Sequence, residues 1–231
     1  MKKIADISIV SPIYNDTRTL RQVLTTVNTL LSKRTSSYEI ICIDDASTDD
    51  SVRIAKVCEK HMKHLKVFTH DTNQGIAKTY RELYKRANGK RVVLFSMDGE
   101  WNPNDVLRLL DEQNKTGKDI IIGCRMQKQY TPWRGLVSYM YNFLMNHLFG
   151  VQTRDAGSIK VFKKKVLSLP ILSNGVFDEA ERLLRASRAG YTIGYLPIDH
   201  YKKIKRKRGI RMSHVIEALF DMIRVYRTLR V

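Results

Sequence analysis

The chain has 231 residues, of which 43% are hydrophobic, so we expect one large domain with a sizeable core. Its 41 lysines and arginines outnumber 23 acidic residues, and the formal net charge of +18 predicts an anionic partner. Three widely spaced cysteines in apolar contexts, Cys42, Cys58 and Cys124, argue against a disulfide framework or a zinc site and indicate reduced core thiols of a cytoplasmic protein.

No segment has the length and uniform apolar character of a membrane span. The nearest candidate, residues 135–153, is interrupted by Ser138, Asn142, Asn146 and His147, so a half-buried helix is expected there. The N-terminal sequence MKKIADISIVSP enters a strand pattern directly, and no signal peptide is predicted.

The first 125 residues alternate short apolar runs with helical patterns. The expected strands cover residues 7–11, 39–44, 65–69, 91–97 and 119–123. The helices expected between them cover residues 20–31, 51–61, 75–87 and 104–114. This alternation of continuous apolar strands with helices predicts an α/β fold with a parallel sheet covered on both faces.

The remaining sequence is less regular. The elements expected here are helices at residues 135–149 and 177–189, and strands at residues 158–162 and 191–196. A final amphipathic helix is expected at residues 213–230, with an apolar stripe formed by Val215, Leu219, Met222, Tyr226 and Leu229. The expected organisation is one domain over residues 1–211, followed by the helix within residues 212–231.

Acidic residues gather where the predicted strands end. Four strand ends read SPIYND (residues 11–16), DDASTDD (44–50), SMDGE (96–100) and GCR (123–125). Ligands of parallel α/β sheets bind beyond the carboxyl ends of the strands. Three acidic ends out of four therefore indicate a binding site for a metal and a phosphorylated ligand.

Seven segments follow one another in order: SIVSPIYND, IICIDDASTDDS, NQGIAKTYREL, VVLFSMDGEWNP, DIIIGCR, RDAGSIKVFKKKVL and GYTIGYLPIDHYKKIKRKRG. Together they cover residues 5–211 and resemble the inverting family 2 glycosyltransferases, within which the dolichyl- or polyprenyl-phosphate sugar synthases are the most similar branch. The resemblance implies a GT-A fold, which is a Rossmann-like, mostly parallel central sheet with helices on both faces, here followed by a C-terminal amphipathic helix. It also implies transfer of a hexose from a UDP- or GDP-sugar to a polyprenyl phosphate.

The resemblance places the nucleotide sugar at the acidic strand ends. The implied donor-site residues are Pro12, Tyr14, Asp16, Asp44, Asp45, Gly75, Lys78 and Asp98. Tyr14 would offer a ring and Asp16 an acceptor to the base, and the two aspartates after the second strand would reach ribose hydroxyls or a base N–H. The alternatives are a plain turn after the first strand, a helix cap at Ser47 or Thr48, and an ordinary helix N-terminus at Gly75.

The fourth strand end resembles the metal-binding Asp-x-Asp of the family. Asp98 aligns with its second aspartate, Ser96 stands where the first belongs, and Glu100 follows two residues later. Mg²⁺ or Mn²⁺ bound between nucleotide phosphates takes one or two protein oxygens, which Asp98 and Glu100 can supply. The ion would neutralise charge on the leaving diphosphate. The alternative is a weakened or lost metal site and a catalytically weakened relative.

A polyprenyl phosphate is ionised near neutral pH, so it needs positioning more than a strong base. Arginine suits this task because its planar fork binds phosphate bidentately. The residues implied for the acceptor phosphate are Arg125, Arg134, Arg206, Arg208 and Arg211. Asp155 matches an acidic position on the acceptor side, where it would orient an arginine or touch the sugar. The expected catalytic set is Asp98, Arg125, Arg134 and Asp155.

The C-terminal sequence has the composition of a membrane-surface element. Seven lysines and arginines fall within residues 202–211, directly before the amphipathic helix. This predicts peripheral association with an anionic membrane surface, helped by a membrane-protein partner or a second copy of the chain. The alternative, which can hold at the same time, is that the helix packs onto the domain.

Two other functions explain less of the sequence. A saccharide acceptor would require a general base near the sugar, and no residue stands out for that role. Nucleic-acid binding is disfavoured because the basic run lacks interleaved aromatic residues beyond Tyr201 and would leave the acidic strand ends unexplained.

Overall fold

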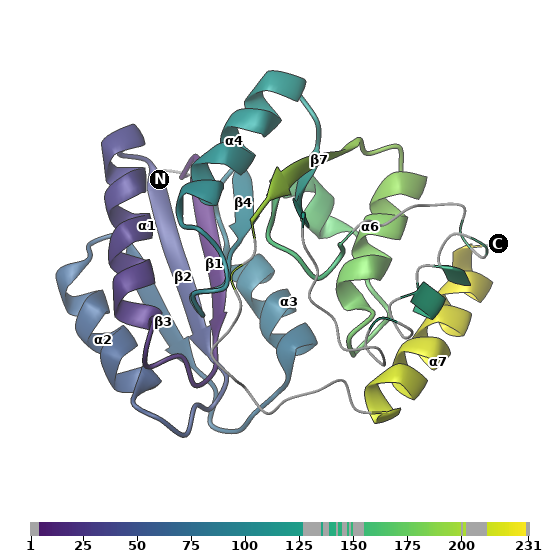
Figure 1. Ribbon diagram of the computed structural model, residues 1–231, viewed down its shortest axis with the longest axis horizontal. Coiled ribbons are helices and arrows are strands. Elements are labelled where there is room, and N and C mark those ends of the chain that lie inside the picture. Colours follow the sequence, from purple (N-terminus) through teal and green to yellow (C-terminus); the bar gives the residue numbers. More distant parts are fainter. Residues whose placement is uncertain are drawn as a thin grey trace.

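The computed structural model describes residues 5–126, 155–199, 201 and 212–229, together with residues 135, 139–141, 143, 144, 147 and 149. In this part of the chain a seven-stranded sheet lies at the centre, with helices on both faces (Figure 1). The predicted α/β fold class is therefore confirmed.

The strands lie in the order β3-β2-β1-β4-β6-β5-β7. Their bounds are β1 Ile7–Ile13, β2 Tyr38–Asp44, β3 Leu65–Thr69, β4 Arg91–Leu94, β5 Ile120–Arg125, β6 Lys160–Lys163 and β7 Ile193–Ile198. Strand β6 runs antiparallel to both of its neighbours, β4 and β5, while the other described pairs are parallel. The sequence pattern predicted the strands but not the reversed direction of β6.

The helices fall close to their predicted positions. Their bounds are α1 Leu20–Arg34, α2 Ser51–His61, α3 Ile76–Arg86, α4 Asn104–Thr116, the 3₁₀ helix η1 Lys164–Ser168, α6 Asp178–Arg188 and α7 Met212–Leu229. The described residues between positions 135 and 149 are helical as well. No helix among the described residues combines the length and apolar character needed to cross a bilayer.

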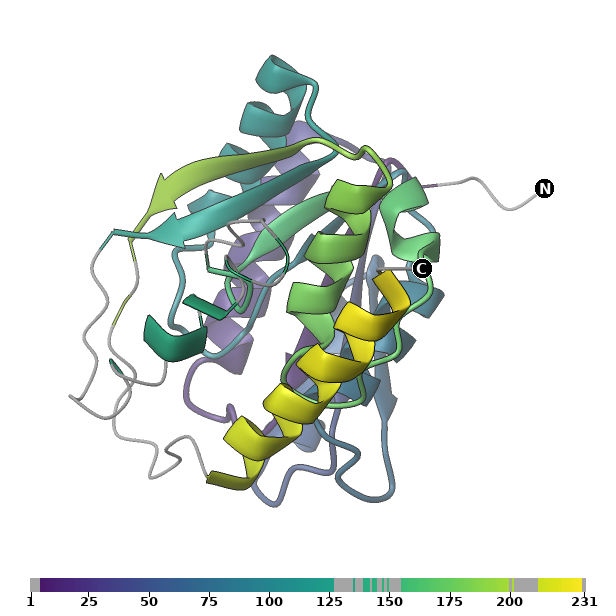
Figure 2. The ribbon, with the colours of Figure 1, turned by 90° about the vertical axis from the view of Figure 1, so that its right-hand side faces the viewer.

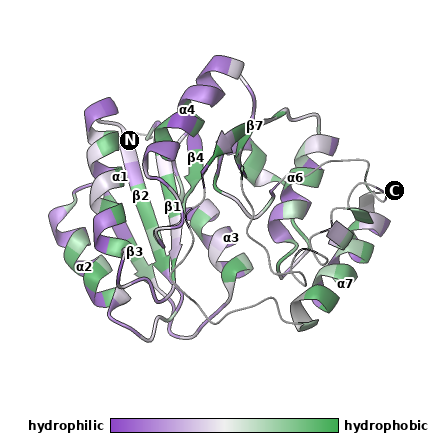
Figure 3. Cartoon of the chain, viewed as in Figure 1, coloured by the Kyte–Doolittle hydropathy of each residue, from purple (hydrophilic) through white to green (hydrophobic). Residues whose placement is uncertain are grey.

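Alternation along the strands divides the core into two layers. Ile7, Ile9 and Ile13 of β1 join a buried cluster with α1, α2 and α4, whereas Val10 joins another with α3, η1 and α6. Successive strand side chains point to opposite faces, so both faces of β1 must be apolar to be covered. Figure 3 shows this hydrophobic colouring along the central strands.

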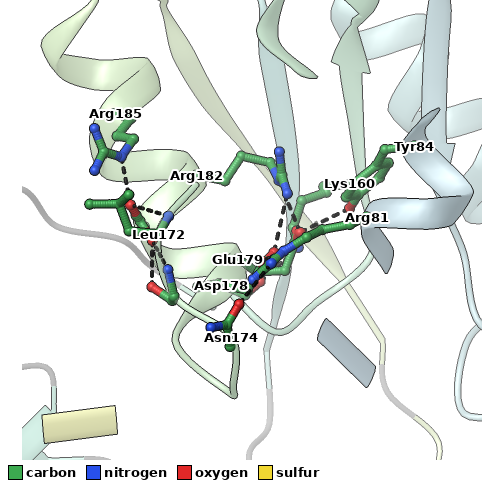
Figure 4. A network of polar contacts seen from close by, with 12 residues as sticks. Arg81, Tyr84, Lys160, Leu172, Asn174, Asp178, Glu179, Arg182 and Arg185 are labelled. Atoms are coloured by element: carbon green, nitrogen blue, oxygen red, sulfur yellow. Dashed lines mark hydrogen bonds and ion pairs between the residues drawn. The ribbon is translucent and has the colours of Figure 1, made fainter. Parts of the chain in front are cut away.

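Helix α6 buries charged residues as well as apolar ones (Figure 4). The Lys160 side chain is fully buried, and its Nζ donates to Glu179 Oε2 at 2.8 Å and to the Ala156 carbonyl at 2.7 Å. Arg182 Nε donates to Glu179 Oε1 at 3.2 Å. Burial alone would raise the pKa of Glu179, but the charges of Lys160 and Arg182 outweigh burial and hold it below its usual range.

The same network reaches α3. Arg182 Nη2 donates to Asp178 Oδ1 at 3.1 Å, and Arg81 Nε donates to Asp178 Oδ2 at 2.7 Å. Tyr84 contributes its hydroxyl, which donates to Glu179 Oε1 at 3.1 Å. Ionic contacts thus join α3, β6 and α6 on one face of the sheet.

Helix α7 packs on the outer side of α6 (Figures 1 and 2). Met222 and Val225 are buried in a cluster with Phe177 and Leu184 of the α6 region, and Ala218 is buried on the same side of α7. The predicted alternative that this helix packs onto the domain therefore describes its inner face correctly.

Candidate active site

The loops that follow β1, β2, β4 and β5 leave the sheet at one edge, because these strands run in the same direction (Figure 1). We call this edge the carboxyl edge. It carries the described residues that the sequence predicts around a nucleotide sugar.

The loop after β1 is shaped by Asp16. One carboxylate oxygen of Asp16 accepts the backbone N–H of Tyr14 at 3.2 Å, and its own N–H donates to Ser51 Oγ at 2.7 Å. Asn15 between them has a positive φ of 55°. Pro12 and Tyr14 are half-buried, whereas Asp16 is buried. The loop is thus a fixed turn, and its contact with a base stays a prediction.

The two aspartates after β2 organise their surroundings differently. Asp44 is fully buried and accepts from the backbone N–H of Ser47 at 2.8 Å and from its hydroxyl at 2.5 Å. Asp45 accepts the N–H groups of Gln74 at 2.7 Å and Gly75 at 2.9 Å. Asp45 therefore ties the β2 loop to the start of α3.

Gly75 opens the space in front of α3. Its φ is +82°, and a Cβ built on it would meet no atom within 4 Å. Lys78 lies one turn further on, is exposed, and donates to the side chain of Gln74. The helix N-terminus, Gly75 and Lys78 thus adjoin the Asp45 loop, as a donor-binding role requires.

His70 supports the same loop. Its Nδ1 lies 2.7 Å from Asp45 Oδ1 and its Nε2 lies 3.0 Å from Glu82 Oε2. Burial lowers the pKa of His70, but hydrogen bonds and charge from Asp45 and Glu82 outweigh burial and raise it above its usual value.

We therefore expect His70 to stabilise the protein most at acidic pH. A raised folded-state pKa contributes fully below the unfolded pKa of about 6.5 and is lost as pH rises through the folded value. Near pH 6, His70→Gln should lower the free energy of unfolding by about 1.5–3 kcal/mol, the size of a hydrogen bond to a charged group. The difference from wild type should shrink with rising pH in urea titrations. A pH-independent difference would contradict the protonated state.

The turn after β4 carries Asp98 and Glu100. Asp98 Oδ1 accepts the backbone N–H of Glu100 at 3.0 Å, and both side chains are half-buried. Gly99 between them has a φ of +77°, a conformation that favours glycine. Thr19, just before α1, donates its hydroxyl to the Met97 carbonyl at 3.0 Å. This contact links the turn to the β1 loop.

Gly99→Ala should damage this turn. A Cβ on Gly99 would lie 2.7 Å from Thr19 Cγ2, in addition to the strain of its positive φ. We expect a loss of about 2–3 kcal/mol in the free energy of unfolding, together with weaker donor binding. Gly117→Ala is the matched control, because Gly117 has a φ of +66° and open space around it. Its cost should be about 1 kcal/mol. Equal losses in thermal and urea unfolding would refute the clash.

The oxygen atoms of this turn suit a divalent ion whose other ligands are mainly nucleotide phosphates. Within the described residues, no group of three or more His, Cys, Asp or Glu could hold an ion by itself. Mg²⁺ in phosphate sites commonly takes only one or two carboxylates, and Asp98 with Glu100 supplies two. Ser96 is half-buried and stands where the resemblance implies the first aspartate.

Arg125 and Asp155 meet at the end of β5. Arg125 Nε lies 3.0 Å from each oxygen of Asp155, its Nη2 also pairs with Oδ1, and its backbone N–H donates to Oδ2 at 2.9 Å. The guanidinium carbon lies 5.8 Å from the centre of the Trp101 ring. Asp155 thus orients an arginine, one of the two roles expected of it, beside the turn of Asp98.

The other arginines expected at the acceptor phosphate lie outside the described residues. They are Arg134, Arg206, Arg208 and Arg211. Their placement stays a prediction.

Two residues of the site were missed by the sequence reasoning. The sequence analysis assigns no role to Thr19, which precedes the helix predicted at residues 20–31, or to Tyr80, which falls within the helix predicted at residues 75–87. Burial raises the pKa of the Tyr80 phenol, and the charges of Glu179, Asp98 and Asp178 raise it further. The charges of Asp98 and of the α6 carboxylates thus both act on Tyr80. The helical spacing of α3 carries no signal for this position.

Solved structures with the same fold carry nucleotide ligands. Glucosyl-3-phosphoglycerate synthase from Mycobacterium tuberculosis, in complex with Mn²⁺, UDP and phosphoglyceric acid, superposes with a TM-score of 0.72 at 17% identity, covering 96% of this chain and 78% of that one. The mannosyltransferase PcManGT from Pyrobaculum calidifontis, in complex with GDP-Man and Mn²⁺, gives a TM-score of 0.65 at 16% identity, covering 96% and 65%. Identities this low show a shared fold.

Sequence relatives are named for lipid-phosphate chemistry. The undecaprenyl-phosphate 4-deoxy-4-formamido-L-arabinose transferase of Klebsiella pneumoniae (strain 342) is 24% identical over 184 residues. The dodecaprenyl-phosphate galacturonate synthase of Rhizobium johnstonii is 22% identical over 227 residues. The matches cover 74% and 95% of this chain, which spans 56% and 66% of the lengths of the two relatives.

The family assignment rests on a match to a family pattern. The pattern described as Glycosyl transferase family 2 matches residues 8–168, which run from the second residue of β1 to the end of η1 and so include β2 to β6 in full. The matched region also contains the loops of Asp16, Asp45, Asp98 and Arg125. With the fold and the acidic carboxyl edge in place, we conclude that this chain belongs to glycosyl transferase family 2.

Proposed function

We propose that the chain transfers a hexose from a UDP- or GDP-sugar to a polyprenyl phosphate, with inversion at the anomeric carbon. The observation that carries the proposal is the Arg125–Asp155 pair, which places an ordered guanidinium beside the turn of Asp98. The names of the two sequence relatives support the acceptor class.

The donor would lie along the carboxyl edge. Tyr14 and Asp16 would contact the base, and the loops of Asp44, Asp45 and Gly75 would contact the ribose and diphosphate. Lys78 would add positive charge near the phosphates. A bound Mg²⁺ or Mn²⁺, held by Asp98 and Glu100, would supply positive charge to the leaving diphosphate.

The acceptor needs positioning more than deprotonation. An oxygen of the lipid phosphate would attack the anomeric carbon from the face opposite the diphosphate. The bond from that carbon to the diphosphate oxygen would break, and the nucleoside diphosphate would leave with the bonding electrons. Asp155 fixes the plane of the Arg125 guanidinium before the acceptor arrives, so ordering costs less on binding. Arg134, Arg206, Arg208 and Arg211 would complete the phosphate site.

A saccharide acceptor is the second candidate, because the α6 region offers a carboxyl group with a raised pKa. Burial is the main cause of the raised pKa of Asp178, and the charge of Glu179 adds to it. However, its two oxygens accept from Arg182 and Arg81. Asp178 therefore suits a structural role better than proton transfer, and we favour the phosphate acceptor.

The reaction would take place at the cytoplasmic face of a membrane, because a polyprenyl phosphate resides in the bilayer. Peripheral association, with or without a membrane-protein partner, follows from this acceptor.

Incubation with UDP- and GDP-sugars and a short polyprenyl phosphate tests the proposal. We expect radiolabelled sugar to enter the organic phase with one donor, and Arg125→Ala to reduce the initial rate by about 100-fold. Arg53→Ala, an exposed arginine on α2, is the control and should retain the full rate. Transfer to soluble saccharides alone would favour the second candidate and refute the lipid acceptor.

A further inference from the structure

Helix α7 keeps a second apolar face that the domain does not cover. Exposed large side chains lie along it at helical spacing. They are Met212 at 55% exposure, Ile216 at 47%, Leu219 at 41%, Phe220 at 69% and Ile223 at 48%. Residues three and four apart lie on one side of a helix, so these side chains form a continuous stripe. We call this stripe the outer face of α7.

The outer face differs from the stripe that the sequence suggested. Within that predicted stripe, Met222 is buried, Val215 and Tyr226 are half-buried, and Leu219 is exposed. Most of it therefore packs toward α6. Apolar residues therefore cover more of the circumference of α7 than the part that contacts the domain.

The acidic side chains of α7 are turned away from the outer face. The carboxylate of Glu217 lies over Gly175, where its Cδ would be 2.4 Å from an added Cβ. Asp221 is half-buried, and burial raises the pKa of its carboxyl while the nearby backbone of Gly175 and Asn174 lowers it. Both carboxylates thus face the loop before α6, and the outer face carries no acidic residue among the described side chains.

Positive charge borders the outer face instead. Arg224 and Arg227 are exposed on α7. The seven lysines and arginines of residues 202–211 precede its first turn directly in the chain. An apolar stripe bordered by basic residues is complementary to the headgroups and acyl boundary of an acidic bilayer. A contiguous apolar face of this kind is better suited to contact with lipid than to contact with water.

We propose that the outer face of α7 inserts into the headgroup region of an anionic lipid bilayer. This goes beyond sugar transfer, because the face would bind acidic lipids whether or not an acceptor is present. Figures 1 and 2 show α7 beginning at the end of the molecule where β1 and β2 terminate. The first turn of α7 and the carboxyl edge thus lie at the same end of the molecule.

Vesicle co-sedimentation of the full chain tests the inference without any polyprenyl phosphate. The vesicles contain equal parts of phosphatidylglycerol and phosphatidylcholine, and pure phosphatidylcholine serves for comparison. We expect wild-type protein to partition to the acidic vesicles, and the double variant I216D/F220D to partition at least about tenfold less. The matched control is T25D/T29D, which adds the same charge at exposed positions of α1 and should partition like the wild type.

A second measurement does not depend on whether the double variant I216D/F220D folds. Phe220→Trp should give a blue-shifted emission on addition of acidic vesicles, measured against the unchanged background of the native tryptophans. Equal partitioning of I216D/F220D and T25D/T29D would overturn the inference. So would a wild-type dimer that I216D/F220D converts to a monomer without any vesicle binding, because the face would then contact a second copy. If the wild-type protein bound acidic vesicles but transferred no sugar, the proposed function would be refuted and the lipid-binding inference would stand.

Discussion

Asp98→Asn should lower the rate of sugar transfer by at least about 100-fold, because the carboxylate would act where charge develops on the leaving diphosphate. The side chain is half-buried at the end of β4, and the turn holds it through the N–H of Glu100. Asparagine keeps the size of the side chain and an acceptor oxygen for that bond. The loss should therefore appear in the rate while the folded state persists, as circular dichroism can check.

Glu100→Gln should have a smaller effect, and it should raise the Mn²⁺ concentration needed for half-maximal activity. The comparison variant is Asp111→Asn on α4, an exposed partner of Arg34 that is remote in the fold from the carboxyl edge. It should retain the full rate. Isothermal titration of Mn²⁺ with the nucleoside diphosphate gives a readout that does not depend on turnover. If Asp98→Asn and Glu100→Gln both left the activity and the Mn²⁺ binding unchanged, the turn would have no role in the reaction.

Glu179→Leu should destabilise the protein by about 3–5 kcal/mol, because it leaves the buried ammonium of Lys160 without its carboxylate. The Lys160 side chain is 0% exposed and that of Glu179 is 7% exposed. Arg182 and Tyr84 would also lose an acceptor. Urea unfolding followed by circular dichroism measures the loss.

The double variant K160M/E179L should recover much of that loss, because apolar side chains of similar size can replace a buried ion pair at little net cost. Asp111→Asn again serves as the comparison, since it breaks an exposed pair and should cost no more than about 1 kcal/mol. If Glu179→Leu cost as little as Asp111→Asn, the buried ion pair would have no special role in stability.

The sequence predicted most of the sheet because its strands are covered on both faces. The run at residues 39–44 lies in β2, which is buried along its whole length, whereas residues 65–69 form the edge strand β3, in which Lys66 and Thr69 are exposed. The direction of β6 could not be read in this way. A strand pattern is the same in either direction, and the reversal depends on how the chain returns after β5.

The sequence places Asp98 and Glu100 together because one short turn carries both, and their role as metal ligands stays a prediction. The site was not predictable where two loops meet. The bonds from Asp45 to the start of α3 and from Thr19 to Met97 join residues 29–30 and 78 positions apart. The Arg125–Asp155 contact was left open between two roles, because only the fold brings the end of β5 beside the start of β6.

The reversal of β6 brings the two ends of the segment between β5 and β6 close together. Strand pairing joins Ile122 to Lys160, and an ion pair joins Arg125 to Asp155. These two contacts hold both ends of the segment between β5 and β6. Closure entropy rises by only about 0.6 kcal/mol for each doubling of the length of a connection. We therefore expect a change in the length of this segment to leave the pairing of β1, β2 and β4 intact.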